Sequence, residues 1–245
     1  MKTFKFVVAT KRSETEKESL PIMSFIRGVN HDDIKVDVKI FFNNSKGLSE
    51  VYNEVLNESD CADYTVFVHD DLWINDYLVY DKLQDSSKYF DVIGICGGKT
   101  WNADSIDVNH PINWCVASRK SGINGFMVHA LNVDKNSKKH TMSYMNSTLF
   151  ATSYGETPSR TLTIDGSFIC FTKKAVEAGL RFDSQFKFHF YDMDVSISAF
   201  VKKLSVGVSP ILATHESIGD SQSQPEFLES QKQFLLKWFD CSKKI

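Results

Sequence analysis

Three groups of ionisable residues stand where an apolar, strand-like segment ends or where a helix begins. They are His69-Asp70-Asp71, Asp192 and His215. Adjacent carboxylates repel each other unless a positive group lies between them, and carboxylates and imidazoles are common ligands of divalent cations. This arrangement indicates a divalent metal and a carboxylate base on one edge of a sheet. The alternative is that Asp70 and Asp71 cap the following turn and that Asp192 is an N-cap residue.

The first hundred residues alternate between predicted strands and helices. Runs of β-branched and aromatic residues predict strands at 5–10, 35–42, 64–69 and 91–96. Helices are predicted from a capping box at Ser13, over 48–56 where apolar residues recur at helical spacing, and over 75–89. Such alternation is typical of an α/β fold with a mainly parallel sheet, in which ligands bind beyond the carboxyl ends of the strands.

Several further residues fall on this same sheet edge. Thr10 and Arg12 follow the first predicted strand, and Gly97-Gly98 follow the fourth. The glycine pair is a weak signal for a phosphate-binding loop, which a tight turn explains equally well. Asn53 lies beside the apolar stripe of the 48–56 helix, where it is either a ligand contact or a solvated helix residue.

The second half of the chain shows a different pattern. Residues 100–159 are rich in Asn, Ser, Asp and Thr, which indicates an irregular segment that carries part of a binding site, with Trp101 as one lining residue. Strands are predicted at 164–171, opened by Asp165-Gly166, and at 206–213. Helices are predicted to begin near Asp192 and at Pro225, and the second is expected to dock on the domain.

The bulk composition excludes several classes of protein. The net charge of -3 and the pI of about 6.2 disfavour a general nucleic-acid binder, although they do not exclude a local basic groove. No apolar run approaches the length of a membrane span, and the N-terminal residues do not resemble a signal peptide. Five scattered cysteines fit reduced thiols, so we expect a cytoplasmic protein.

Five segments, taken together and in order, resemble glycosyltransferases of the GT-A fold, in particular the small, soluble, bacterial glycosyltransferase-like branch of family 2. These segments are GLSEVYNEVLNES (47–59), DYTVFVHDDLWI (63–74), IDGSFICF (164–171), FHFYDMDVSISAF (188–200) and THESIG (214–219). The resemblance covers roughly residues 4–98 and 162–220. It implies one GT-A domain over 1–245, with a nucleotide-binding half (1–98), an acceptor-side half (99–220) and a C-terminal docking helix (221–245).

The resemblance also implies ligands and roles. The donor would be a nucleotide-sugar, most commonly a UDP-sugar, and the acceptor a hydroxyl of a saccharide or another molecule. The family's Asp-x-Asp motif falls on 69–71, so that Asp71, with His215, would hold Mn²⁺ or Mg²⁺. Asp192 would be the catalytic base. Donor contacts are expected from Thr10, Arg12, Asn53, His69, Asp70 and Gly97. Sugar or acceptor contacts are expected from Trp101, Asp165, Gly166 and Tyr191. The chain departs from the family at His69 and Tyr191, which replace acids.

The chemistry is consistent with these roles. A divalent ion neutralises a diphosphate leaving group, and a base within hydrogen-bond reach activates an acceptor hydroxyl. We expect the helix N-terminus to lower the pKa of Asp192, and a single displacement to invert the anomeric carbon. Two alternatives stay open: a catalytically inactive nucleotide- or saccharide-binding protein on the same fold, and a nucleotidyltransferase. The latter is disfavoured because only Lys11-Arg12 could form a basic phosphate loop.

Overall fold

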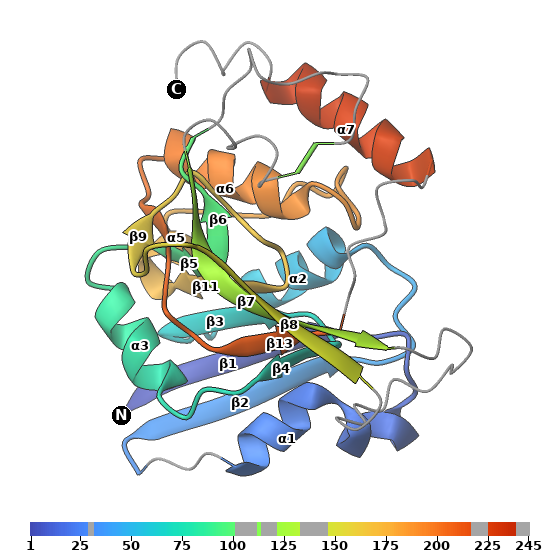
Figure 1. Cartoon of the computed structure of the whole chain (residues 1–245), viewed down its shortest axis with the longest axis vertical. Coiled ribbons are helices and arrows are strands. Elements are labelled where there is room, and N and C mark those ends of the chain that lie inside the picture. The colour runs from blue at the N-terminus through green and yellow to red at the C-terminus, as the bar shows by residue number, and fades with distance from the viewer. Residues whose placement is uncertain (29–31, 101–111, 114–121, 133–146, 217–224, 239–245) are drawn as a thin grey trace.

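The computed structural model describes residues 1–28, 32–100, 112–113, 122–132, 147–216 and 225–238, which form two β-sheets and the helices that cover them (Figure 1). One cluster of buried side chains extends from Phe4 to Trp238. Among the described helices, none combines the length and the apolar character that crossing a lipid bilayer requires.

The larger sheet confirms the expected α/β fold, but it is mixed rather than mainly parallel, since three of its six strand pairs are antiparallel. Its strands, in spatial order, are β2 (Ile34–Phe41), β1 (Lys2–Ala9), β3 (Tyr64–Val68), β11 (Phe168–Thr172), β5 (Val92–Gly94), β12 (Val206–Val208) and β9 (Ser159–Arg160). β1 is parallel to β2 and β3, and β5 is parallel to β12. β11 is inserted antiparallel between β3 and β5. Every residue of β3 is buried, as its run of β-branched and aromatic side chains predicts.

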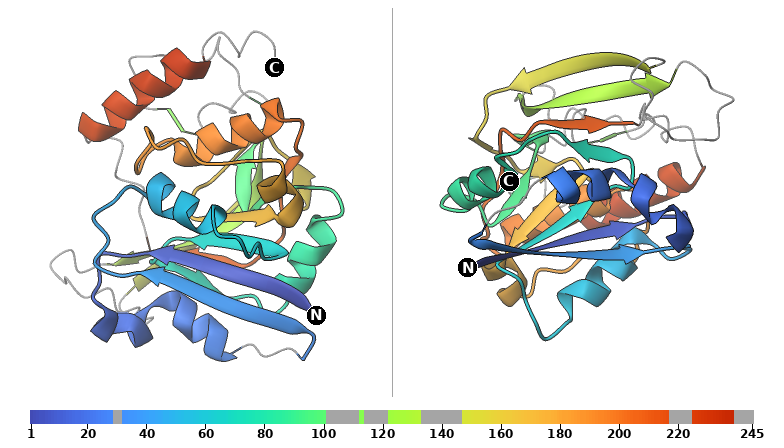
Figure 2. Two further views of the ribbon diagram at one scale, coloured as in Figure 1. Left: turned by 180° about the vertical axis from the view of Figure 1, so that it is seen from behind. Right: turned by 90° about the horizontal axis from the view of Figure 1, so that it is seen from below.

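A smaller sheet was not foreseen from the sequence. Its order is β10 (Thr163–Ile164), β6 (Cys96–Gly98), β7 (Ile123–Asn132), β13 (Ala213–His215) and β4 (Leu72–Ile74), with β8 (Ser147–Gly155) paired to β7. β7 and β8 form a ribbon on the outside of the molecule (Figure 2, right). Two expectations are wrong here. Gly97-Gly98 lie in β6 and form no loop. The strand expected at 206–213 is two strands in different sheets, because the chain breaks at Pro210 between them.

The helices of the described residues are η1 (Glu14–Ser19, a 3₁₀ helix), α1 (Pro21–Gly28), α2 (Leu48–Leu56), α3 (Val79–Ser86), α5 (Lys173–Glu177), α6 (Tyr191–Val201) and α7 (Pro225–Trp238). α1 and α2 lie on opposite faces of the β1–β2–β3 region (Figure 2, right), whereas α7 contacts α6. On one face the Phe6 ring lies 5.7 Å from Phe25, and on the other the Phe67 ring lies 4.6 Å from Tyr52. Aromatic packing therefore fixes both layers.

Two helix predictions need correction in their limits. The capping box at Ser13 is present, but it starts the short 3₁₀ helix η1, and Pro21 then begins α1 as a first helical residue. The helix expected over 75–89 covers only 79–86, because residues 72–74 form β4 and Asp76 holds a turn. Its carboxylate accepts hydrogen bonds from the backbone N–H of Leu78 (3.0 Å) and of Leu212 (2.9 Å).

Candidate metal and transfer site

Two short strands assemble the candidate metal ligands. The chain leaves β3 at Val68, passes through His69–Asp71 and enters β4, and β13 pairs with β4 so that His215 lies opposite Leu72. His215 Nε2 lies 3.2 Å from Asp71 Oδ1, and His69 Nδ1 lies 3.9 Å from the same oxygen. One ligand atom from each of these three residues falls within 4.8 Å of the others. Residues from opposite halves of the chain thus converge on one point.

Two consecutive hydrogen bonds determine which ring nitrogen of His69 carries the proton. The Tyr191 hydroxyl donates to the carbonyl oxygen of Gly166 (2.8 Å), so that its oxygen accepts from His69 Nε2–H at 2.7 Å. His69 Nδ1 is then left with its lone pair and faces Asp71. Burial lowers the pKa of His69, although the charge of Asp71 opposes this effect, and the ring is therefore neutral. A metal-binding histidine held through its second nitrogen has this arrangement.

His215 and Asp71 also fit a divalent ion. His215 Nε2 is buried without an aligned hydrogen-bond partner among the described residues, although Asp71 is near. Burial disfavours a charge on His215, but Asp71 outweighs this effect and raises its pKa. Burial likewise acts to raise the pKa of Asp71, but His215 and His69 hold it well below its usual range. Two imidazole nitrogens beside one carboxylate suit a first-row transition metal such as Mn²⁺ better than Mg²⁺, which prefers oxygen ligands only.

Asp192 lies in the first turn of α6, and it is linked to these candidate ligands through Asp165, which interacts electrostatically with Asp192, His215 and His69. Its Oδ1 accepts a hydrogen bond from the backbone N–H of Met193 at 2.8 Å. Burial raises the pKa of Asp192 to about 7, and the negative charge of Asp165 adds to this shift. The expected lowering of this pKa by the helix N-terminus is therefore wrong, because the loss of hydration and the nearby charge outweigh the helix dipole.

The loop between β10 and β11 supplies Asp165 and Gly166. The Asp165 carboxylate accepts hydrogen bonds from the backbone N–H and the hydroxyl of Ser167. Burial acts to raise the pKa of Asp165, but His215 and these hydrogen bonds lower it, so that the group is ionised. A Cβ atom on Gly166 would lie 2.4 Å from the Tyr191 hydroxyl and 3.2 Å from Asp192 Cβ. Only glycine allows this close approach.

The remaining predicted site residues divide into two groups. Thr10 belongs to the site edge, since its hydroxyl donates to the Asp70 carboxylate at 2.6 Å and joins the ends of β1 and β3. Arg12, Asn53 and Gly97 are not brought to the metal ligands by any contact among the described residues. Their donor role stays a prediction, and Trp101 lies outside the described residues.

Each of those three residues has a structural role. The Arg12 guanidinium donates to the Ser19 carbonyl (3.3 Å) and hydroxyl (3.2 Å). The Asn53 amide donates to the Phe182 carbonyl (2.7 Å) and accepts from the Phe182 N–H (3.0 Å). A Cβ atom on residue 97 would lie 2.1 Å from the Thr163 carbonyl oxygen, so that close strand packing explains the glycine.

Sequence reasoning missed one buried network behind the site. Asp194 is fully buried in α6, and its Oδ1 accepts from Trp238 Nε1 at 2.8 Å and lies 2.7 Å from Lys237 Nζ. These contacts attach α7 to the helix that carries Asp192. The available signal was a carboxylate between Met193 and Val195, which the helical spacing places in the core and which therefore requires a buried partner.

Comparison with solved protein structures identifies the fold. No family model matches the chain, and no curated protein sequence matches it. The solved structure of S. aureus TarS 1-349 is 14% identical, with a TM-score of 0.52 over 96% of this chain and 64% of that one. GalNAc-T7, solved with UDP, GalNAc and Mn²⁺, is 10% identical, with a TM-score of 0.53 over 98% of this chain and 50% of that one. Both are glycosyltransferases of the GT-A type. The chain has a GT-A fold. It spans one half to two thirds of the length of these GT-A proteins.

Proposed function

We propose that this protein is a metal-dependent, inverting glycosyltransferase that moves a sugar from a nucleotide-sugar to an acceptor hydroxyl. The observation that carries the proposal is the convergence of His69, Asp71 and His215 on one point. It is supported by Asp192, a carboxylate that interacts with them through Asp165 and whose pKa is raised to about 7. The GT-A fold supports it, and so does a structural neighbour solved with UDP and Mn²⁺. On this basis UDP-sugars are the first donors to test.

The three ligand residues would hold the ion, which would neutralise the diphosphate leaving group when bound. Tyr191 orients His69 so that its Nδ1 lone pair faces the site. Asp70, held by Thr10, would shape the donor side of the same edge. These residues therefore bind and orient the donor, and none of them needs to exchange a proton with the acceptor.

Asp192 would accept the proton of the acceptor hydroxyl. As that oxygen bonds to the anomeric carbon, the bond from this carbon to the diphosphate breaks, and one displacement inverts the configuration. A carboxylate with a pKa of about 7 is a stronger base than an ordinary aspartate and is still half ionised near neutral pH. The ionised Asp165 contributes to this shift. Asp165 would also contact the transferred sugar or the acceptor.

A thermal-shift panel tests the binding half of this proposal. UDP, GDP, CMP and dTDP are each added with Mn²⁺ or with EDTA. A nucleotide at 100 times its Kd adds about 2.7 kcal/mol to the free energy of unfolding, which for a chain of this size is a shift of roughly 5–10 °C. We expect one nucleotide to stabilise the protein only with Mn²⁺, and Asp71→Asn to abolish the shift. Asp81→Asn, which alters an exposed residue of α3, is the matched control.

Product analysis tests the catalytic half. Incubation with the matching nucleotide-sugar and Mn²⁺ should release nucleoside diphosphate from the wild-type protein and far less from Asp192→Asn. Binding without release would identify an inactive nucleotide-binding protein on the same fold, and release of pyrophosphate would identify a nucleotidyltransferase. No shift with any nucleotide, in either condition, would refute the metal and donor assignments together.

A further inference from the structure

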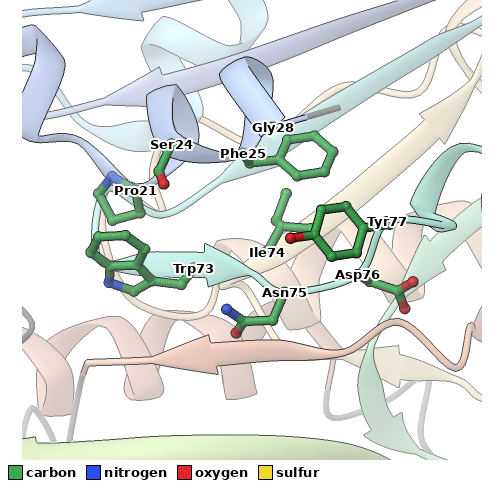
Figure 3. A pocket seen from close by; sticks show the side chains of 9 residues that line it. All are labelled: Pro21, Ser24, Phe25, Gly28, Trp73, Ile74, Asn75, Asp76 and Tyr77. Atoms are coloured by element: carbon green, nitrogen blue, oxygen red, sulfur yellow. The ribbon is translucent and has the colours of Figure 1, made fainter. Parts of the chain in front are cut away.

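A pocket lies between α1 and β4, and none of the candidate metal ligands lines it (Figure 3). Its volume is about 290 Å³, near the lower end of the range for small-molecule sites. It is lined by Pro21, Ser24, Phe25, Gly28, Trp73, Ile74, Asn75, Asp76 and Tyr77. Such a volume accommodates one or two sugar rings but no folded partner. Its walls show what kind of molecule fits.

Aromatic rings form much of the wall. Trp73 and Tyr77 lie at opposite ends of the pocket with Ile74 between them, and Phe25 of α1 also lines it (Figure 3). Phe25 is buried in the core, but Tyr77 is 73% exposed and its ring has no stacking partner among the described residues. An exposed aromatic ring that borders a pocket offers an apolar face to a ligand. The C–H faces of a sugar ring are apolar and pack on such rings.

Polar groups of the pocket lining suit the edges of a sugar ring. Asn75 Oδ1 accepts a hydrogen bond from the Thr214 hydroxyl at 2.7 Å, which fixes the orientation of the amide. The Asn75 NH₂ group is then available as a donor, and the Ser24 hydroxyl is a second polar group of the lining. A few oriented polar groups among aromatic rings are typical of ligand pockets.

Charge argues against an anionic ligand. The nine lining residues include no cation, and Asp76 is their one ionisable carboxylate. Its Oδ1 accepts from the Leu78 N–H, and its Oδ2 accepts from the Leu212 N–H and from Lys82 Nζ at 2.6 Å. Both oxygens of the Asp76 carboxylate therefore already accept hydrogen bonds from protein groups, and Lys82 is paired with this carboxylate. A phosphate or carboxylate group would find no positive partner here, whereas a neutral saccharide needs none.

The pocket is connected to the candidate metal site by two hydrogen bonds that pass through Glu216. Trp73 Nε1 donates to Glu216 Oε1 at 3.0 Å, and Glu216 N–H donates to the Asp71 carbonyl oxygen at 3.0 Å. Trp73 is two residues from Asp71, about 7 Å along an extended chain. A saccharide held in the pocket would thus lie within one or two sugar units of the transfer site.

We propose that the α1–β4 pocket binds a neutral saccharide unit of the acceptor, remote from the hydroxyl that reacts. Its role as an acceptor site rests on the proposed function, but saccharide binding itself requires neither metal nor donor. The test therefore uses the wild-type chain in EDTA without nucleotide. The probes are maltotriose, cellotriose and triacetylchitotriose, and the readout is saturation-transfer NMR of each sugar, titrated to obtain its Kd.

Two matched variants make the test specific. Tyr77→Ala removes an exposed ring from the pocket, and Tyr89→Ala removes a ring that is 70% exposed and lies outside it. We expect at least one probe to bind, Tyr77→Ala to raise its Kd about tenfold or more, and Tyr89→Ala to leave it unchanged. Equal Kd values for wild type and Tyr77→Ala, an equal loss in Tyr89→Ala, or no binding by any probe would overturn the proposal. If no saccharide binds but a nucleotide does, only the pocket proposal fails. If a saccharide binds but no nucleotide does, the transferase assignment fails and the acceptor role with it, and only saccharide binding in the pocket remains.

Discussion

Replacing the proposed base with its neutral isostere should make the protein more stable as well as inactive. The pKa of Asp192 is raised from 3.8 to about 7, mainly by burial. A tenfold change in a protonation equilibrium is worth about 1.4 kcal/mol, so the rise in this pKa corresponds to about 4 kcal/mol between the two protonation states. Because the side chain keeps partial access to solvent, we expect Asp192→Asn to gain about 2 kcal/mol at pH 8. That gain raises Tm by roughly 4–8 °C in a chain of this size.

The gain in stability of Asp192→Asn over the wild-type protein must increase as the pH rises from about 4 to 7. Between about pH 4 and 7 the folded state of the wild-type protein keeps a proton on Asp192 that the unfolded state has lost, so wild-type stability falls as the pH rises. Above pH 7 Asp192 is ionised in both the folded and the unfolded state, so the stability that the wild-type protein loses through this buried charge no longer changes with pH. The stability difference between Asp192→Asn and wild type should therefore be near zero at pH 4, grow up to pH 7 and stay level above it.

The assay is thermal unfolding in EDTA across this pH range, with Asp81→Asn as a control for the loss of one charge at a first-turn position. The control should stay within about 0.5 kcal/mol of wild type. In parallel, Asp192→Asn should lower sugar transfer by about 10²- to 10⁴-fold. A variant that loses transfer but shows no pH-dependent gain in Tm would refute the reasoning that burial sets the basicity of this carboxylate.

Three further variants probe the supporting contacts. Tyr191→Phe removes the hydroxyl that holds His69 and should weaken Mn²⁺ binding about 10- to 100-fold by titration calorimetry, whereas unchanged affinity would contradict the hydrogen-bond chain. Lys237→Met leaves Asp194 buried without its cation and should lower the free energy of urea unfolding by about 2–3 kcal/mol; a loss below about 0.5 kcal/mol would show that the pair is not stabilising. Asn53→Ala removes two hydrogen bonds to the backbone and should lower the free energy of urea unfolding by about 1–3 kcal/mol; an unchanged value would show that these bonds do not stabilise the fold.

Local sequence patterns predicted the elements whose signals are local. The alternation in 35–42 and the apolar spacing in 48–56 correspond to β2 and α2 within one residue. The smaller sheet was missed because β4, β6, β10 and β13 have two or three residues each, too few for a period to be visible. Their pairing partners are also far apart in sequence, as with Leu72 and His215.

For the candidate site, the sequence indicated which residues belong to it better than it indicated their orientation and pKa. Asp71, His215 and Asp192 were expected to converge from the ends of their elements. Asp71 and His215 lie side by side, whereas Asp192 is linked to them through Asp165, whose charge acts on Asp192 and interacts with His215. His69 was expected to contact the donor, yet it lies among the metal ligands, because its orientation depends on Tyr191, which is 122 residues away. The pKa of Asp192 was predicted in the wrong direction, since helix position is visible in a sequence and burial is not.

The attachment of α7 to α6 has a consequence for protein synthesis. Asp194 is buried in α6, but both groups that contact its carboxylate, on Lys237 and Trp238, lie more than 40 residues later in the chain. At about 5–20 residues per second, they are made roughly 2–9 s after Asp194 itself. Until then the carboxylate cannot be buried in its ionised form without a large free-energy cost. The helix that carries the proposed base can therefore complete its packing around an ionised Asp194 only after Lys237 and Trp238 have been made, so docking of α7 precedes the final packing of α6.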